Sequence, residues 1–349
     1  MSRSFWTPLH AKIHRTIRSR HLFERNQRLL VGVSGGQDSL CLIKLLLDLQ
    51  PKWGWDLGIV HCDHRWRGDS QANAKHVENL AKSWDISFYL ETAIEALDSE
   101  AAARNWRYQT LNAIAKKHNY NYIVTGHTAS DRAETLLYNL MRGTGADGLQ
   151  ALTWQRPLSD NILLVRPLLE VTRTQTKDFC ENLQLPIWED STNEDLKYTR
   201  NRIRLELLPY LQENFNPKVE SALAQTAELL QAEVEYLEQA ADRLRSEAMR
   251  GGVDEWEKRG VGEVSKELLL SPPFALKLNR RVLQKAPLAL QRRVMRYCLQ
   301  QILPHSPSFE QIEKLTALIT APNRSQTDPF PGGAIAKVEN DWIIFESKT

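Results

Sequence analysis

The sequence predicts an α/β protein: a doubly wound, mainly parallel five-stranded sheet, followed by a mostly helical C-terminal domain with a small β-hairpin. Two observations predict it. Short apolar runs alternate with helical segments through residues 28–166, a spacing that favours parallel strands joined by helical crossovers. Beyond residue 203 apolar residues recur mainly at helical spacing. At 349 residues the chain is long enough for two or three domains.

The five strands are expected at short apolar segments, and helices are expected between them. The strand segments are residues 28–34, 56–61, 86–90, 120–125 and 162–166. The helical segments are residues 37–49, 70–84, 100–117 and 130–141. Ligands of doubly wound sheets bind beyond the carboxyl ends of the strands. Polar residues that follow these strands are therefore the candidates for a site.

The rest of the chain is expected to be largely helical. A polar segment at 189–195 is interpreted as a loop or lid, and a helix is expected at 203–211. A long amphipathic helix follows, because apolar residues recur at alternating steps of four and three. They are Val219, Leu223, Thr226, Leu230, Val234, Leu237, Ala241 and Leu244. This seam packs either within the chain or against a second copy, so a homodimer is one expectation.

Three parts are expected from these elements. A basic N-terminal helix within residues 1–27 packs on a catalytic domain at residues 28–215. A helical domain at residues 216–349 contains further helix at 263–321 and ends in a hairpin formed by 331–338 and 342–345.

Positive charge is concentrated in two segments, although the net charge is only +2. Residues 3–28 hold seven Lys or Arg and one acid, and residues 268–309 hold seven Lys or Arg and no acid. Such segregation favours an anionic partner such as nucleic acid, and solvated helix faces are the alternative. No apolar run is long enough to span a membrane, and no secretory signal is present. The four scattered cysteines fit a reducing compartment and form no metal motif. We expect a cytoplasmic protein.

The segment Ser34-Gly35-Gly36-Gln37-Asp38-Ser39 lies between a predicted strand and a predicted helix. Its glycines allow close approach of phosphate oxygens, and the helix offers unpaired N–H groups. Ser34 and Ser39 add hydroxyl donors. Asp38 would repel phosphate unless a cation intervenes, so we assign it to Mg²⁺. A glycine-containing turn with a serine cap is the structural alternative.

Polar residues follow the second and fourth strands. His61, Asp63 and His64 are either metal ligands or a polar strand end. Gly126 and His127 end the fourth strand. Asp131 and Glu134, in the first turn of the next helix, either compensate its dipole or serve a cation or an amine. Arg200 and Arg204 share a helix face that suits phosphate. Arg104, Arg107 and Tyr108 also share a face, but Glu100 lies four residues before Arg104, so a surface salt bridge is the alternative there.

The segment 34–39 resembles the signature of the N-type ATP-pyrophosphatase (PP-loop) superfamily, whose members activate an oxygen with AMP and release pyrophosphate. The ordered motifs that follow resemble the tRNA(Ile)-lysidine synthetase family over residues 28–212, and more weakly beyond. They are His61-x-Asp63-His64, Glu100 with Arg104, Arg107-Tyr108, Gly126-His127 with Asp131 and Glu134-Thr135, Met141-Arg142-Gly143, Arg166 to Leu169, and Arg200-Asn201 with Arg204. The fold implied is that of the adenine nucleotide alpha hydrolases. The second C-terminal domain of longer members is not expected.

The resemblance implies a reaction and roles. Free L-lysine is ligated to C2 of the wobble cytidine of the CAU-anticodon isoleucine tRNA through an adenylated intermediate, with ATP and Mg²⁺ as cofactors; decoding changes from AUG to AUA. The implied ATP site is Ser34, Gly35, Gly36, Gln37, Asp38, Ser39, His61, Asp63, His64, Gly126, His127 and Arg204. The implied catalytic residues are Asp38, Asp131, Glu134, Arg107 and Arg200. Asp131 and Glu134 bind the lysine, with Glu134 the stronger candidate for its amine. The residues implied to bind tRNA are Arg15, Arg18, Arg67, Arg104, Arg142, Arg280, Arg281 and Arg292.

Three other functions compete with this interpretation. A tRNA thiolase shares the nucleotide loop but normally shows paired cysteines, and an amidotransferase-linked synthetase needs a glutaminase partner. A non-catalytic nucleotide- or tRNA-binding protein would not need Asp38, Asp131 and Glu134 together.

Overall fold

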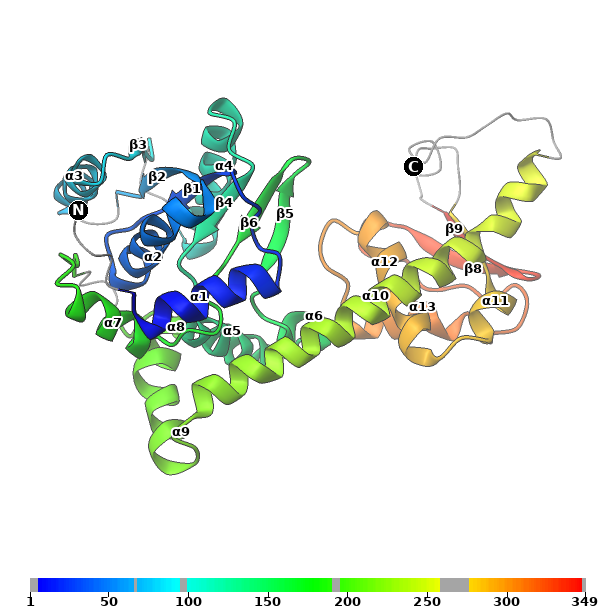
Figure 1. Ribbon diagram of the computed structural model, residues 1–349. Helices are drawn as coiled ribbons and strands as arrows, with labels where there is room; N and C mark the ends of the chain where they lie inside the picture. Colours follow the sequence, from blue (N-terminus) through cyan, green and yellow to red (C-terminus); the bar gives the residue numbers. More distant parts are fainter. Residues whose placement is uncertain (1–5, 66–67, 95–98, 190–194, 258–275, 347–349) are drawn as a thin grey trace. The chain divides into compact units, whose positions relative to one another are not determined.

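The structure, a computed structural model, describes residues 6–65, 68–94, 99–189, 195–257 and 276–346 (Figure 1). Internal contacts divide the chain into two compact units, Met1–Gln231 and Ala232–Thr349. Each unit is described by itself.

The first unit is built on a six-stranded sheet. The strands are β1 (Arg28–Gly32), β2 (Asp56–Asp63), β3 (Ser87–Thr92), β4 (Tyr122–Thr125), β5 (Gln155–Ser159) and β6 (Ile162–Val165), in the order β3-β2-β1-β4-β6-β5. All neighbours pair in parallel except β5, which is antiparallel to β6. The doubly wound class is confirmed.

The predicted number of five strands is wrong, because β5 lacks a strand-like sequence. The segment Gln155–Ser159 contains a polar residue, an arginine and Pro157. Proline cannot donate to a ladder and is confined to edge strands or bulges. β5 is an edge strand with an irregular register beside Pro157. It forms because it pairs with β6, and its own sequence does not indicate a strand.

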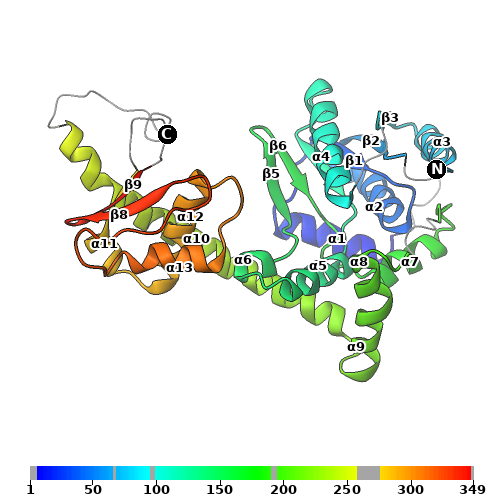
Figure 2. The same ribbon diagram turned by 180° about the vertical axis from the view of Figure 1, so that it is seen from behind.

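Helices cover both faces of the sheet (Figures 1 and 2). The helices on one face are α1 (Pro8–Ser19), α2 (Gln37–Trp53), α3 (Ser70–Ser83) and α7 (Arg173–Asn182), and α4 (Glu100–Lys117) packs on the other. Side chains of a strand alternate between faces. Leu29 and Val31 accordingly join one core, and Leu30 joins the other. On α1, Ile13 and Ile17 are buried in the first core.

The strand order reverses beside β1. The chain passes from β1 through α2 to β2 on one side, and from β3 through α4 to β4 on the other. Such a switch point places a ligand crevice at the carboxyl ends of β1 and β4. The helix that follows β4 is α5 (Ala129–Met141), and the short α6 (Ala146–Leu149) comes next.

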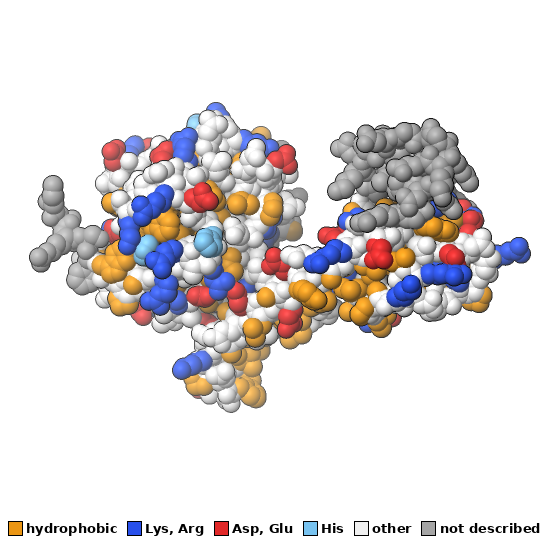
Figure 3. All heavy atoms as spheres, turned by 45° about the vertical axis from the view of Figure 1, so that its right-hand side comes forward, with side chains coloured by type: hydrophobic (Ala, Val, Ile, Leu, Met, Phe, Trp, Pro, Cys, Tyr) orange, Lys and Arg blue, Asp and Glu red, His pale blue; other side chains and the backbone are white. Residues whose placement is uncertain are grey.

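The single helix expected at 203–211 is three consecutive segments: α8 (Thr199–Arg202), a π-helical turn (Ile203–Leu207) and α9 (Leu208–Asn214). A π turn depends on local packing that apolar periodicity does not report. In Figure 3 hydrophobic side chains gather on the projecting tip that α9 forms. Tyr210 on α9 and Phe215 directly after it are exposed, and their rings meet edge to face with centroids 5.9 Å apart.

The long helix α10 (Val219–Glu257) belongs to both units and continues through Gly251 and Gly252, where its end was expected. Its apolar seam is used within the chain. Val219 and Leu223 pack on the α5–α9 core of the first unit, while Ala241 and Leu244 pack in the core of the second. These contacts supply the intrachain alternative, and the homodimer stays a prediction.

The second unit combines helices with a small sheet. Its elements are β7 (Lys277–Asn279), α11 (Arg280–Gln284), α12 (Leu288–Ile302), α13 (Phe309–Ala317), β8 (Ile335–Glu339) and β9 (Trp342–Glu346), with strand order β7-β9-β8. The predicted hairpin is confirmed as β8 and β9. The expected helix is wrong at β7, which pairs with β9; residues 263–275 of that prediction lie outside the described residues. Within the described ranges no helix combines the length and the apolarity needed to cross a bilayer.

Candidate active site

The nucleotide loop joins β1 to α2 and is held by its two serines. The Ser39 hydroxyl donates to the Gly36 carbonyl at 2.9 Å and accepts from the Ser34 amide at 3.2 Å. The Ser34 hydroxyl accepts from the Gly36 amide at 3.4 Å. Gly36 caps α2 without a side-chain hydrogen bond, so no N-cap side chain occupies the first N–H groups of the helix. This geometry suits a phosphate group.

Two glycines allow close approach around this loop. Gly35 has φ +89°, and a Cβ there would lie 2.6 Å from the Asn73 Oδ1. A Cβ on Gly126 would lie 2.9 Å from the Asp38 carbonyl oxygen. Gly126 therefore lets the end of β4 touch the first turn of α2, which brings the two predicted motifs together.

Asn73 on α3 supports the loop, although the sequence analysis did not select it. Its Nδ2 donates to the Ser34 carbonyl at 3.0 Å, and its side chain is buried. Trp188 closes the other side, since its amide donates to the Gly35 carbonyl at 3.0 Å. An asparagine on an otherwise ordinary helix gives no sequence signal of this role.

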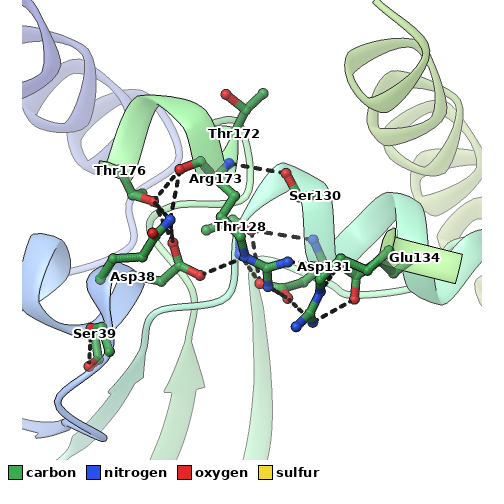
Figure 4. A network of polar contacts seen from close by, with 12 residues as sticks. Asp38, Ser39, Thr128, Ser130, Asp131, Glu134, Thr172, Arg173 and Thr176 are labelled. Atoms are coloured by element: carbon green, nitrogen blue, oxygen red, sulfur yellow. Dashed lines mark hydrogen bonds and ion pairs between the residues drawn. The ribbon is translucent and has the colours of Figure 1, made fainter. Parts of the chain in front are cut away.

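Three carboxylates converge on one guanidinium beside the loop (Figure 4). Arg173, at the start of α7, donates through Nε to Asp38 at 3.2 Å, through Nη2 to Asp131 at 2.7 Å and through Nη1 to Glu134 at 2.9 Å. Thr176, one turn later, donates to the other oxygen of Asp38. The predicted acids thus meet in one cluster, here called the acid cluster (Asp38, Asp131 and Glu134).

Sequence reasoning missed Arg173. It follows the Arg166–Leu169 motif and begins a helix whose N-cap, Thr172, forms a capping box. An arginine in a first turn is unfavourable to the helix dipole, and that local conflict is the signal that could have selected it.

Arg204 adds a second positive charge to the acid cluster. It donates to both oxygens of Glu134, at 2.7 and 2.9 Å. Arg204 lies in the π turn, and such turns are frequent at functional sites. Arg200, its predicted companion, lies with its guanidinium carbon 5.8 Å from the centroid of the Tyr138 ring, so the two arginines serve different neighbours.

Burial and mutual charge set the protonation of the cluster. Burial raises the pKa of Asp38, and Asp131 adds to the increase, although Arg173 opposes both. Burial also acts against ionisation of Asp131, but Arg173, His127 and the Thr128 hydrogen bonds together lower its pKa. Asp131 accepts from the Thr128 amide at 2.7 Å and hydroxyl at 2.9 Å. Two neighbouring acids with opposite shifts are typical of a catalytic site.

Two histidines near the site, His127 and His64, have lowered pKa values. Burial and then Arg166 lower the pKa of His127 to about 3, and its Nδ1 lies 2.9 Å from the Thr125 hydroxyl. Burial and Arg107 lower the pKa of His64 to about 4. Arg107 donates to the His64 Nε2 at 3.2 and 3.3 Å. His61 donates through Nδ1 to the Val33 carbonyl at 2.8 Å, because a carbonyl can only accept.

The structure gives no metal-ligand set at the end of β2. The Asp63 side chain accepts from the Arg65 amide at 2.8 Å. Across the described ranges no three His, Cys, Asp or Glu side chains gather so that they could hold a metal ion. Mg²⁺ usually binds through one or two carboxylates together with phosphate oxygens. Asp38, beside the nucleotide loop, fits that mode, whereas His61, Asp63 and His64 do not form a set.

The predicted tRNA-binding arginines lie in different settings. Arg15 and Arg18 are exposed on α1, and Arg142 is exposed after α5. In the second unit several are already paired: Arg281 with Asp341 at 2.6 Å and Arg292 with Glu313 at 2.6 Å. Arg280 donates to the Ala321 carbonyl. Arg67 and the side chain of Glu100 lie outside the described residues.

Fold and site together define a PP-loop nucleotide-binding protein. Residues 7–211 match the family model of the PP-loop domain, and residues 278–341 match that of the TilS substrate binding domain. A tRNA thiolase, NcsA from Methanococcus maripaludis, is similar with a TM-score of 0.54 over 64% of this chain and 78% of that chain. Its sequence identity of 16% shows a shared fold alone.

The chain belongs to the tRNA(Ile)-lysidine synthase family. It is 74% identical to the tRNA(Ile)-lysidine synthase of Nostoc sp. The aligned region covers 98% of this chain and 98% of the relative. It is 48% identical to that of Synechocystis sp., over 98% and 99% of the two chains. It is 36% identical to the chloroplastic enzyme of Zygnema circumcarinatum, over 90% and 81%. These relatives set the thiolase and amidotransferase alternatives aside.

Proposed function

We propose that the chain uses ATP to ligate free L-lysine to C2 of the wobble cytidine in the CAU-anticodon isoleucine tRNA, and that the product reads AUA in place of AUG. One observation carries the proposal beyond family membership. The acid cluster already holds a cation, the Arg173 guanidinium, beside a phosphate-binding loop. A site built in this way can hold a substrate ammonium next to an activated phosphate.

In the first step the cytidine O2 attacks the α-phosphorus of ATP, and the bond to the pyrophosphate oxygen breaks. Negative charge grows on the pyrophosphate. The N–H groups at the start of α2 and the Ser34 and Ser39 hydroxyls are positioned to stabilise it. Asp38 would hold Mg²⁺ together with phosphate oxygens, and the bound ion would neutralise part of this charge.

In the second step the lysine ε-amine attacks C2, and AMP leaves. The amine is an ammonium near pH 7, so it needs a carboxylate to bind and a base to take its proton. Asp131 and Glu134 meet the first need: their carboxylates would bind the ammonium in addition to Arg173. Glu134, with both oxygens directed to Arg204, is the base we favour. Arg107 and Arg200 are assigned to the phosphate of the intermediate.

The tRNA body is assigned to basic residues outside this site. Arg15 and Arg18 on α1, together with Arg142, are exposed, and phosphate contacts of this kind weaken as salt rises. Arg280, Arg281 and Arg292 would exchange their present partners for phosphates. We place the protein in the cytoplasm, and we keep a homodimer as one alternative for its assembly.

A single incubation tests the proposal. The protein is mixed with tRNA transcript, ATP and labelled lysine, and the nucleosides are analysed by mass spectrometry. We expect a lysine-bearing cytidine from the intact chain. We expect neither this product nor pyrophosphate release from Asp38→Ala. Absence of the product with the intact chain, under conditions where the tRNA binds, rules out the proposed reaction.

A further inference from the structure

A group of arginines surrounds Tyr108, and His127 is influenced both by these arginines and by Asp131 of the acid cluster. The guanidinium carbon of Arg156 lies 4.8 Å from the centroid of the Tyr108 ring, and that of Arg104 lies 5.3 Å away. Arg166 is close enough to the Tyr108 hydroxyl to help lower the pKa of Tyr108. We call Arg104, Arg156 and Arg166 the arginine cluster; Arg107 lies one turn beyond Arg104 on α4.

Arg166 is buried, and no carboxylate in the described part of the chain forms an ion pair with it. Within the described residues two arginines are buried, Arg132 and Arg166, each with 1% of its surface exposed. Arg132 is paired with Glu228 at 2.6 Å. Arg166 donates to the Thr153 carbonyl at 2.6 Å, and its Nε has no partner. An unpaired buried charge is strongly unfavourable, which indicates a ligand that supplies the missing negative charge.

Among the described side chains, the remaining members of the cluster also have no acid partner. No described carboxylate forms an ion pair with Arg104 or Arg156, whereas Arg173 and Arg204 meet the acid cluster. Burial opposes ionisation of Tyr108, yet Arg104, Arg166 and Arg156 together lower its pKa. The ring therefore lies in a strongly positive field that no described side chain neutralises.

The cluster lies close to the nucleotide loop. His127, whose pKa responds to Arg166 and Arg104 as well as to Asp131, directly follows Gly126, which touches the Asp38 backbone. Arg156 comes from β5, the edge strand, and Arg166 follows β6, whose register places Arg156 opposite Leu164. The two terminal strands of the sheet therefore supply one side of the cluster, and α4 supplies the other.

We propose that the arginine cluster binds the phosphodiester of the RNA strand at the reacting nucleoside, with Arg166 as the buried anchor and Tyr108 and its flanking guanidinium groups as a surface for an unstacked base. This assignment rests on the proposed function and names a subsite for its RNA substrate. Arginine forks match phosphate oxygens, and aromatic and guanidinium planes stack on splayed RNA bases.

An RNA phosphate fits the cluster better than the carboxylate of an amino acid does. A phosphodiester and a carboxylate each carry one negative charge, but an RNA strand brings a phosphate with every nucleotide, so three guanidinium groups, with a fourth on Arg107, can meet successive phosphates. Arg107 is exposed and Arg166 is buried, so the positive residues extend from the surface inward, as a strand entering the site requires. A small carboxylate would need neither this extent nor the Tyr108 ring.

Binding of a hairpin that carries the CAU anticodon loop tests the assignment without any chemistry. The variants are Arg104→Gln and Arg156→Gln, both only partly buried, so Arg166 and the interior stay intact. Arg28→Gln is the matched control. Its guanidinium carbon lies 4.6 Å from the centroid of the Tyr120 ring, but Arg28 is paired with Asp56 at 2.7 Å. Arg28 begins β1, whereas the nucleotide loop follows the other end of that strand.

We expect each cluster variant to raise the Kd of the hairpin roughly tenfold and to reduce the salt slope of binding by about 0.7. The control should change neither. A neutral methylphosphonate at one phosphate flanking the cytidine should weaken binding to the intact protein by a similar factor. The same substitution should add little to Arg156→Gln, because the contact is already lost.

Two results would overturn the assignment. One is a raised KM for lysine with unchanged hairpin affinity, which gives the cluster to the amino-acid carboxylate. The other is unchanged hairpin affinity together with unchanged KM for lysine and ATP, which leaves the cluster a structural role. Failure of the intact chain to make lysidine would refute the proposed function instead, because hairpin binding needs neither ATP nor lysine.

Discussion

At the scale of single residues, Gly126 is the position where the smallest change should have the largest effect on nucleotide binding. A Cβ there would lie 2.9 Å from the Asp38 carbonyl oxygen and 3.1 Å from the Ser39 amide. Backbone atoms cannot move aside as a flexible side chain can. Gly126→Ala should therefore displace the first turn of α2 and raise the KM for ATP by roughly tenfold, in line with the effect of misplacing binding groups by a fraction of an ångström.

The control for this change is Gly68→Ala, where an added Cβ meets nothing within 4 Å. ATP-dependent pyrophosphate release, measured against ATP concentration, should separate the two variants. Equal KM values for Gly126→Ala and the unchanged chain would mean that the contact between β4 and α2 does not position the nucleotide.

Glu134 tests the assignment of the lysine base. Its side chain is 4% exposed, and its carboxylate accepts from Arg173 and from Nε and Nη2 of Arg204. Glu134→Gln keeps the shape and removes the charge. The lysine step should slow by about a hundredfold or more, the range of a lost general base, while pyrophosphate release continues and adenylated tRNA accumulates.

Glu220→Gln is the matched control, since Glu220 accepts from the Ser130 hydroxyl at 2.8 Å beside the same helix but does not contact Arg173 or Arg204 in the described hydrogen bonds. Lysidine formation and pyrophosphate release are measured in parallel. Equal slowing of both steps in Glu134→Gln would show that Glu134 shapes the site as a whole and is not the base.

At the scale of elements, α7 matters because its first residue neutralises the acid cluster. Arg173 lowers the pKa of both Asp38 and Asp131. Its removal in Arg173→Gln should raise those pKa values, so that a higher pH is needed to ionise the acids. The acid limb of the kcat/KM profile should then move upward by about one pH unit or more.

Arg173→Lys should restore part of this shift, because it returns the charge but not the planar guanidinium whose Nε, Nη1 and Nη2 each reach a different carboxylate. Arg202→Gln is the control, since Arg202 is 64% exposed and paired with Glu206 at 3.3 Å. Unchanged acid limbs in Arg173→Gln would mean that these acids do not titrate in the rate-limiting step.

The elements also show what the sequence could predict. The order of β1, α2, β4 and α5 followed from short local patterns, because each strand is a buried apolar run and each helix has its own periodicity. β5 was missed, since an edge strand with a proline and an arginine is recognisable only beside β6. The three acids selected from the sequence lie in one cluster, but Arg173 reaches Asp38 across 135 positions of sequence, and only tertiary packing reveals that contact.

At the scale of the whole molecule, α10 decides where the first unit ends. The boundary expected from sequence lies at residues 215 and 216, and the PP-loop family model ends at residue 211, yet compactness places Gln231 in the first unit. Glu228 explains the difference. It accepts from Arg20 and Arg132 at 2.6 Å and from the Trp154 indole at 2.7 Å. Ser130 likewise donates to Glu220.

A fragment of residues 1–215 should therefore be much less stable than a fragment of residues 1–240. The shorter fragment leaves Arg132, with 1% of its surface exposed, buried without its carboxylate. Breaking such a pair costs about 3–5 kcal/mol, which lowers the Tm of a domain of this size by roughly 10 °C. Glu228→Gln in the longer fragment should reproduce most of the loss, whereas Glu233→Gln on the same helix should not. Thermal unfolding followed by circular dichroism measures all four proteins. Equal Tm values for the two fragments would place the boundary of the catalytic unit at residue 215, and α10 would then only connect the units.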